Sequence, residues 1–157
     1  MHKPFRFFAC AFVLAAIGCS AAPPKPPPPP QLITGPNHDA DLTPAIARER
    51  AAAEAQHERL LVYVGASWCE PCRRFHDALA SGQLDTALRG VRFLEFDSDQ
   101  AKEALARAGY SSKLIPLFAV PRADGTASEQ RIEGSIKGES AVASNLLPRL
   151  RDMLAKP

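Results

Sequence analysis

Two cysteines three positions apart, Cys69 and Cys72, carry the clearest chemical signal in this 157-residue chain. They lie in the stretch ASWCEPCRRF, directly after Trp68, the only tryptophan of the sequence. A Cys-x-x-Cys pair can supply half of a zinc site, form a structural disulfide, or open and close a disulfide during a redox reaction. The surrounding sequence must distinguish these three uses.

A zinc site would need two more ligands, and the candidates are His57 and His76. The chain has neither a second Cys-x-x-Cys motif nor a close histidine pair, so we interpret His76 as a surface residue of a helix. A structural disulfide is not required either, because residues 42–157 are enough to bury a substantial core. The redox use is therefore favoured, and no bound metal is expected.

The elements that must position the pair follow from hydrophobic periodicity. Thr43 and Pro44 predict a helix start, with the threonine hydroxyl as cap, and that helix continues to about Glu58. A buried strand is predicted at residues 59–67. Further predicted elements are a helix at 73–90 with a break at Ser81-Gly82, a strand at 91–97, a helix at 98–110 ended by Gly109, a hairpin at 113–135 with a turn at 123–125, and a final helix at 137–154 with a kink at Pro148.

The predicted order is α-β-α-β-α-β-β-α. Strands separated by helices favour parallel pairing, and the late hairpin adds an antiparallel edge. The expected fold class is therefore α/β, with a central mixed β-sheet flanked by helices.

This order, the Trp-Cys-x-x-Cys between a strand and a long helix, and the pair Ile115-Pro116 before the hairpin together resemble the thioredoxin family. WCEPC differs by one residue from WCGPC, the commonest signature of that family. The resemblance covers about residues 42–155. It implies a thioredoxin-like fold and thiol-disulfide exchange, which needs the two sulfurs and no cofactor.

The resemblance also implies roles for the residues of the motif. Cys69 begins a helix, whose positive end lowers the pKa of a thiol, and it is the expected attacking thiol. Cys72, one turn on and more enclosed, is expected to resolve the mixed disulfide. Pro71 restrains the loop, whereas the charge of Glu70 should oppose ionisation of Cys69. The two arginines after Cys72 act in the opposite direction if they point toward the sulfur.

By resemblance Ile115 and Pro116 form the other wall of the site, with Pro116 in the cis form, although an ordinary trans proline of an edge strand is the alternative. Trp68 is expected to be a partly exposed contact surface. The buried aspartate of the family falls on Tyr63, and its accompanying lysine falls near Phe93. Proton transfer must then use water, Glu95 or another group, or be slow.

The N-terminus has the layout of a secretory signal: Lys3 and Arg6 precede an apolar run of 11 residues at 7–17, too short for a membrane span. AAIGC then resembles the lipobox of bacterial lipoproteins and implies lipid attachment at Cys19. Cys10 would leave with the signal, so Cys69 and Cys72 would be the remaining free thiols. An ordinarily cleaved protein is the alternative.

Three segments are expected: a lipoprotein signal peptide at 1–18, the lipid-attachment cysteine and a Pro-rich linker at 19–41, and a thioredoxin-like domain at 42–157. Residues 23–30 hold seven prolines and one lysine. Such a run forms a polyproline II rod of about 3.1 Å per residue, roughly 25 Å in all, which suits a spacer above a membrane. A ligand for a proline-binding module is the other reading.

The sequence therefore predicts a thiol-disulfide oxidoreductase of the cell envelope that acts on protein thiols and disulfides. The motif CEPC is closer to the motifs of reducing members of the family than to the CPHC motif of its strong oxidants. A reductase that receives electrons from a membrane thiol donor is therefore favoured. Ser20 in place of aspartate favours the outer membrane, facing the periplasm. The alternative is a non-catalytic scaffold lipoprotein of the same fold.

Charge gives no reason to expect nucleic acid as a partner. Without Lys3 and Arg6 of the signal peptide, 17 of the 19 basic residues remain and balance the 17 acidic ones, so the mature protein would be neutral.

Overall fold

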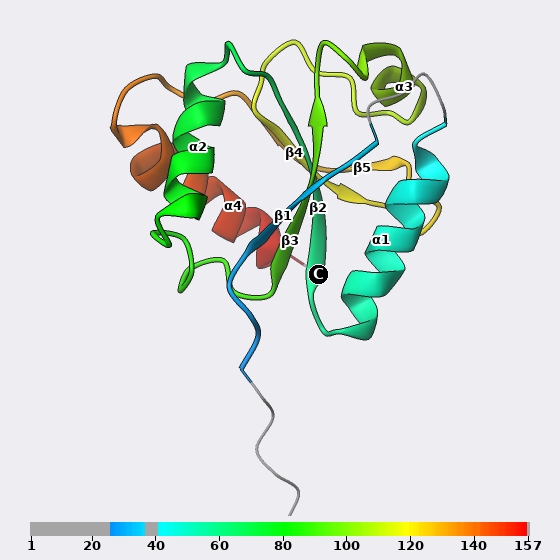
Figure 1. Ribbon diagram of the computed structural model, residues 1–157, viewed down its shortest axis with the longest axis horizontal. Coiled ribbons are helices and arrows are strands. Elements are labelled where there is room, and N and C mark those ends of the chain that lie inside the picture. The colour runs from blue at the N-terminus through cyan, green and yellow to red at the C-terminus, as the bar shows by residue number, and fades with distance from the viewer. Residues whose placement is uncertain (1–25, 37–40, 157) are drawn as a thin grey trace, which may run out of the picture.

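The computed structural model describes residues 26–36 and 41–156. They form a mixed sheet of five strands with helices on both faces (Figure 1). The sequence predicted this architecture with four of the five strands. The proposed signal peptide, Cys19 and Ser20 lie outside the described residues. The elements are β1 (Gln31–Thr34), α1 (Thr43–Ala55), β2 (Arg59–Gly65), α2 (Glu70–Ala80), β3 (Val91–Asp97), α3 (Lys102–Arg107), β4 (Leu117–Pro121), β5 (Ala127–Glu133), the π-helical η1 (Ala141–Leu146) and α4 (Leu147–Leu154).

The strands lie in the order β1-β3-β2-β4-β5. β2 is parallel to β3, and this register places Tyr63 beside Glu95. β4 is antiparallel to both β2 and β5, which confirms the predicted hairpin. The carboxyl end of β2 therefore leads directly into the loop that carries the cysteines.

Residues 31–34, predicted as part of the linker, instead form β1 and pair in parallel with the edge of β3. The strand continues into Gly35, whose N–H donates to the carbonyl of Glu95 at 2.7 Å. An added Cβ at Gly35 would lie 2.5 Å from the ring of Phe96, so only glycine allows this close approach. The predicted order thus lacked its first strand, because four residues beside a proline run show too little periodicity.

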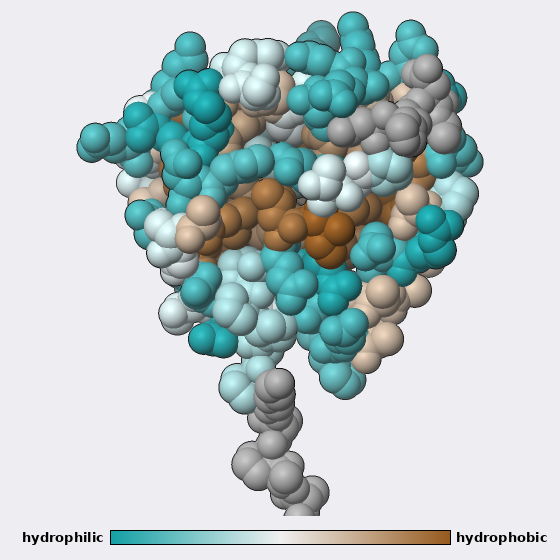
Figure 2. Space-filling view, viewed as in Figure 1, coloured by the Kyte–Doolittle hydropathy of each residue, from teal (hydrophilic) through white to brown (hydrophobic). Residues whose placement is uncertain are grey.

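The end of the proline run also contacts the domain. The N–H of Gly90 donates to the carbonyl of Pro28 at 2.8 Å, and Arg89 donates to the carbonyl of Pro27 at 2.9 Å. These residues are therefore held against the domain and do not act as free spacer. Figure 2 shows a hydrophobic band across the face on which β1 lies in Figure 1, and Leu32 of β1 is 38% exposed.

Two helix ends differ from the prediction. The hydroxyl of Thr43 does not cap α1: the carboxylate of Asp41 accepts from both the N–H and the hydroxyl of Thr43. The final helix begins only at Ala141 and is π-helical until Leu146. Pro148 follows at the start of α4, where its missing N–H cannot continue a regular ladder. No helix in the described part of the chain is long and apolar enough to cross a membrane.

Each face of the sheet has its own hydrophobic core. Helices α1 and α3 cover one face, and α2 and α4 cover the other (Figure 1). The second core is aromatic: the ring of Phe75 on α2 lies 5.3 Å from Tyr63, 5.2 Å from Phe93 and 4.8 Å from Phe118, measured between centroids. Both cysteines belong to this core, so the packing of α2 sets their position.

Replacing Phe75 by alanine tests this dependence. Phe75 is fully buried, so its loss should lower the free energy of unfolding by about 3–5 kcal/mol through lost transfer energy and a cavity. Urea denaturation of the oxidised protein measures the change. Leu32→Ala on the half-exposed β1 is the control and should cost about 1 kcal/mol or less. Equal losses for the two variants would contradict a core centred on Phe75.

Candidate active site

The cysteine pair lies at the junction of β2 and α2, as predicted. Cys69 is the N-cap of α2, with φ −79° and ψ 108°, and its sulfur accepts a hydrogen bond from the N–H of Cys72 at 3.3 Å. The two sulfurs are joined in a disulfide with an S–S distance of 2.06 Å. Pro71 occupies the first turn, where a missing N–H costs nothing. In the reduced protein the same N–H and the helix end would favour a thiolate at Cys69.

Both cysteines of the motif are buried, whereas the tryptophan is exposed. Cys69 is 4% exposed and Cys72 is 2% exposed, so the resolving cysteine is only slightly the more enclosed of the two. Trp68, at 64%, is the exposed part of the motif. Its indole N–H donates to the carboxylate of Asp99 at 2.8 Å, which holds the ring beside Cys69. This placement agrees with a contact surface.

The peptide bond between Ile115 and Pro116 is cis, as the resemblance implied. Pro116 is buried, and its carbonyl accepts from the N–H of Gly134 at 2.9 Å. Ile115 packs against the core that contains both cysteines. The predicted second wall therefore lies against the same core as the disulfide.

Two exposed apolar residues beside this wall escaped the sequence reasoning. Leu114 is 61% exposed and Ile136 is 47% exposed. An added Cβ at Gly134 would lie 3.1 Å from Cβ of Leu114, so the loop after β5 runs close to the residues before β4. We call Trp68, Leu114 and Ile136 the apolar rim. The position of Leu114 directly before Ile-Pro could have indicated it, whereas Ile136 carries no such signal.

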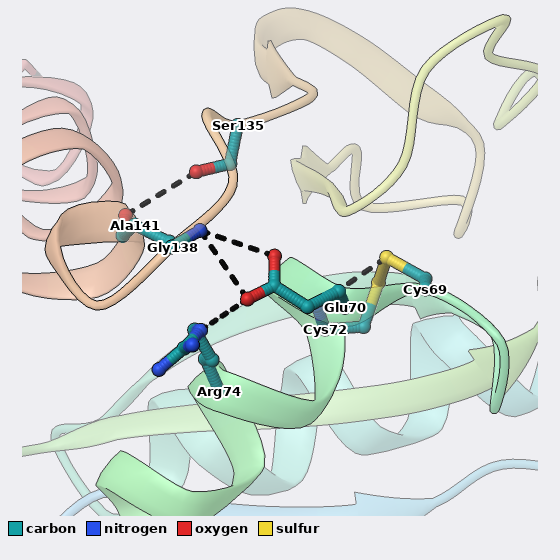
Figure 3. Close-up of polar contacts among 7 residues, drawn as sticks. All are labelled: Cys69, Glu70, Cys72, Arg74, Ser135, Gly138 and Ala141. Carbon is teal, nitrogen blue, oxygen red and sulfur yellow. Dashed lines mark hydrogen bonds and ion pairs between the residues drawn. A yellow bond between two sulfur atoms is a disulfide. The ribbon is translucent and has the colours of Figure 1, made fainter.

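Glu70 connects the motif to the loop after β5 (Figure 3). Its carboxylate accepts from Nε of Arg74, one helical turn on, and from the N–H of Gly138 at 3.2 Å and 3.3 Å. The hydrogen bond from Arg74 is the main reason that the pKa of Glu70 lies below its ordinary value. The carboxylate points away from the disulfide, and Arg73 donates to the carbonyl of Ser67 at 3.0 Å. Glu70 and Arg74 thus largely neutralise each other.

A cavity of about 390 Å³ adjoins Cys72, and we call it the inner cavity. Tyr63, His76 and Glu95 are among its other lining residues. Tyr63 is fully buried at the position of the family's aspartate, and its hydroxyl has no hydrogen-bond partner among the described residues. Burial, and to a lesser degree the charge of Glu95, raises the pKa of Tyr63 far above its ordinary value. Tyr63 therefore stays protonated near neutral pH, so its hydroxyl can donate a hydrogen bond but is not available as a base.

His76 lies on α2 with a partly exposed side chain, as predicted, but it also makes contacts that the sequence did not indicate. Its Nε2 lies 2.7 Å from a carboxylate oxygen of Glu95, and its ring meets Tyr63 edge-on at 5.6 Å between centroids. The hydrogen bond to Glu95 raises the pKa of His76. Phe93, near which the resemblance placed the family's lysine, is a buried ring of the aromatic core. Within residues 26–36 and 41–156, no group of three or more His, Cys, Asp or Glu side chains is placed so that it could hold a metal ion.

Solved structures to which the chain is similar include two thioredoxins. The chain is 17% identical to a poplar thioredoxin h, with 80% of this chain and 98% of that chain covered and a TM-score of 0.48. It is 19% identical to Trichomonas vaginalis thioredoxin, with coverage of 66% and 85% and a TM-score of 0.45. It is 25% identical to Trxlp of Edwardsiella tarda, with coverage of 69% and 93% and a TM-score of 0.42.

The comparison with curated proteins found no match. A family model described as thioredoxin-like matches residues 41–123, more than half of the chain. This span includes the whole of β2, α2 and β3, the cysteine motif and the cis proline. The chain therefore belongs to the thioredoxin-like family.

Proposed function

We propose that this protein is a thiol-disulfide oxidoreductase that exchanges disulfides with proteins through Cys69 and Cys72. The observation that carries the proposal is a cysteine pair at bonding distance, with the sulfur of Cys69 capping a helix. The hydrogen bond to this sulfur and the positive end of the helix both favour the Cys69 thiolate. A thiolate is the nucleophile of disulfide exchange.

The reaction in the reducing direction has two steps. The Cys69 thiolate attacks one sulfur of the partner's disulfide, forms a mixed disulfide and displaces the other partner sulfur as a thiolate. Cys72, once deprotonated, attacks the sulfur of Cys69, forms the Cys69-Cys72 disulfide and releases the second partner thiolate. Two electrons pass to the partner, and both released thiolates take up protons.

The apolar rim supports a protein as the substrate. Trp68 directly precedes Cys69, and Leu114 and Ile136 flank the segment of Pro116 and Gly134. Each of these three rim residues exposes a large apolar side chain. Such a rim suits an apolar chain segment better than a small hydrophilic thiol. The cis bond before Pro116 agrees with the resemblance, in which backbone beside this proline pairs with a substrate strand.

The reducing direction and the cell envelope complete the proposal. The CEPC motif favours a reductase, and a membrane thiol carrier would then be the electron donor. The signal-like N-terminus and the lipobox at Cys19 support a lipid-anchored bacterial protein of the periplasmic space. Ser20 favours the outer membrane. The near-complete burial of Cys69 is the one observation that favours the alternative, a scaffold without turnover.

Two cysteine variants distinguish exchange from scaffolding. Cys69→Ser should lower the rate of insulin disulfide reduction with dithiothreitol by at least about a hundredfold, down to the uncatalysed rate, because the nucleophile is gone. Cys72→Ser should retain the first attack and accumulate mixed disulfides, visible on non-reducing gels. An unchanged rate for Cys69→Ser would reject the redox proposal in favour of the scaffold.

The pairing of Glu70 with Arg74 leads to a separate prediction for the pKa of Cys69. Arg74→Gln leaves the Glu70 charge uncompensated and should raise that pKa, whereas Glu70→Gln should lower it, each by up to about one unit. The double variant should return it close to the starting value. The pH dependence of iodoacetamide alkylation of the reduced protein measures the pKa. Shifts of the same sign in both single variants would show that the pair does not act by charge.

The equilibrium reduction potential tests the direction. A fragment from residue 20 retains β1 and the docked prolines 27 and 28, and it can be equilibrated in glutathione or dithiothreitol buffers. A value near −270 mV, which is typical of thioredoxin, is expected for a reductase. A value near about −120 mV would make the protein an oxidant.

A further inference from the structure

The inner cavity is lined by Cys72 and not by Cys69 or the apolar rim. The two cysteines therefore border different surroundings. The second step of exchange requires Cys72 to lose a proton, and Cys72 is 2% exposed. Burial disfavours a thiolate, so an enclosed thiol needs a base to take its proton near neutral pH.

The inner cavity offers such a base, and we propose that His76 accepts the proton of Cys72 and that Glu95 positions His76 for this role. The proposal rests on the exchange function proposed above and identifies a further residue for it. Tyr63, which stands where the family has an aspartate, remains protonated and so cannot accept the proton.

The placement of His76 supports this role. Cys72 and His76 are four residues apart on α2, so their side chains leave the same side of the helix, one turn apart. Both line the inner cavity. An added Cβ at Gly65 would lie 3.5 Å from Cβ of Cys72 and 2.6 Å from the hydroxyl of Tyr63, so Tyr63 also reaches this region.

The hydrogen bond to Glu95 sets the state of the ring. Nε2 of His76 faces the Glu95 carboxylate at 2.7 Å, so in the neutral ring the proton lies on Nε2 and Nδ1 carries the free lone pair. The bond holds the ring at the cavity wall and makes it a stronger base. The titratable or charged groups around His76 are Glu95 and Asp97 on β3, Tyr63 on β2, and Arg73 and Asp77 on α2.

This arrangement defines the proposed route of the Cys72 proton. It passes from the sulfur of Cys72 to Nδ1 of His76, directly or through one water in the cavity. The Cys72 thiolate attacks the sulfur of Cys69 and displaces the partner thiolate, and the imidazolium returns its proton to solvent. The hydroxyl of Tyr63 is a neutral donor that can stabilise negative charge in the cavity while the Cys72 thiolate exists.

Stopped-flow reaction with 5,5′-dithiobis(2-nitrobenzoate) separates the two steps, because Cys69 releases the first thionitrobenzoate and Cys72 releases the second. The experiment uses the chain without residues 1–18 and with Cys19→Ser, reduced, between pH 5 and 9. The second step should slow below the raised pKa of His76, where the ring is protonated. His76→Gln should remove this acid limb and slow the second step roughly tenfold to a hundredfold at pH 7, with the first step changed less than about twofold.

Two further variants keep the test decisive. Glu95→Gln should lower the pKa of His76 and move the acid limb to lower pH, an effect that a merely structural role would not produce; it decides the question if His76→Gln fails to fold. His57→Asn, on the exposed turn after α1, is the control and should leave both steps unchanged.

The outcomes separate the two proposals. A second step whose pH profile is the same in His76→Gln and the parent chain, or an acid limb that Glu95→Gln does not move, overturns the role of His76 and leaves exchange intact. A parent chain that releases no second thionitrobenzoate overturns the exchange function itself.

Discussion

The docking of α2 on the sheet through Phe75 is the interaction on which the rest of the site depends. Phe75 contacts the rings of Tyr63, Phe93 and Phe118, which belong to three neighbouring strands. This packing holds the first turn of α2 at the end of β2, so that the sulfur of Cys69 meets the N–H of Cys72. If the helix shifted along the sheet, the cap, the disulfide and the inner cavity would change together.

The disulfide separates two surfaces of different character. On the outer side, the apolar rim exposes large side chains, which the proposed exchange would use as the surface for an apolar chain segment. On the inner side, Tyr63, His76 and Glu95 contribute polar groups to the cavity that Cys72 lines. This division suits a reaction in which the partner approaches Cys69 while the proton of Cys72 leaves by another path. The contact of Glu70 with Gly138 adds a link between the motif and the loop that carries part of the rim.

Most of the fold was predictable because its signals are local. Period-two and period-3.6 patterns revealed β2, β3, the hairpin and the helices, and the motif with its proline identified the family. The strand β1 was not predictable in the same way: four residues after a proline run become a strand only because β3 offers them an unpaired edge. The π-helical turn before Pro148 was not predicted either, and it contacts α2, which is distant in the sequence.

The sequence by itself determined the cysteine pair, its place at a helix start, and the tyrosine where the resemblance expects an aspartate, because these depend on residue type and spacing along one segment. Only the tertiary structure decided which charges pair and which groups share a cavity. Arg74 turns to Glu70 and not to the sulfur, and His76 meets Glu95 across the space between α2 and β3. Such contacts join residues from separate elements, and their geometry exists only once α2 has packed on the sheet.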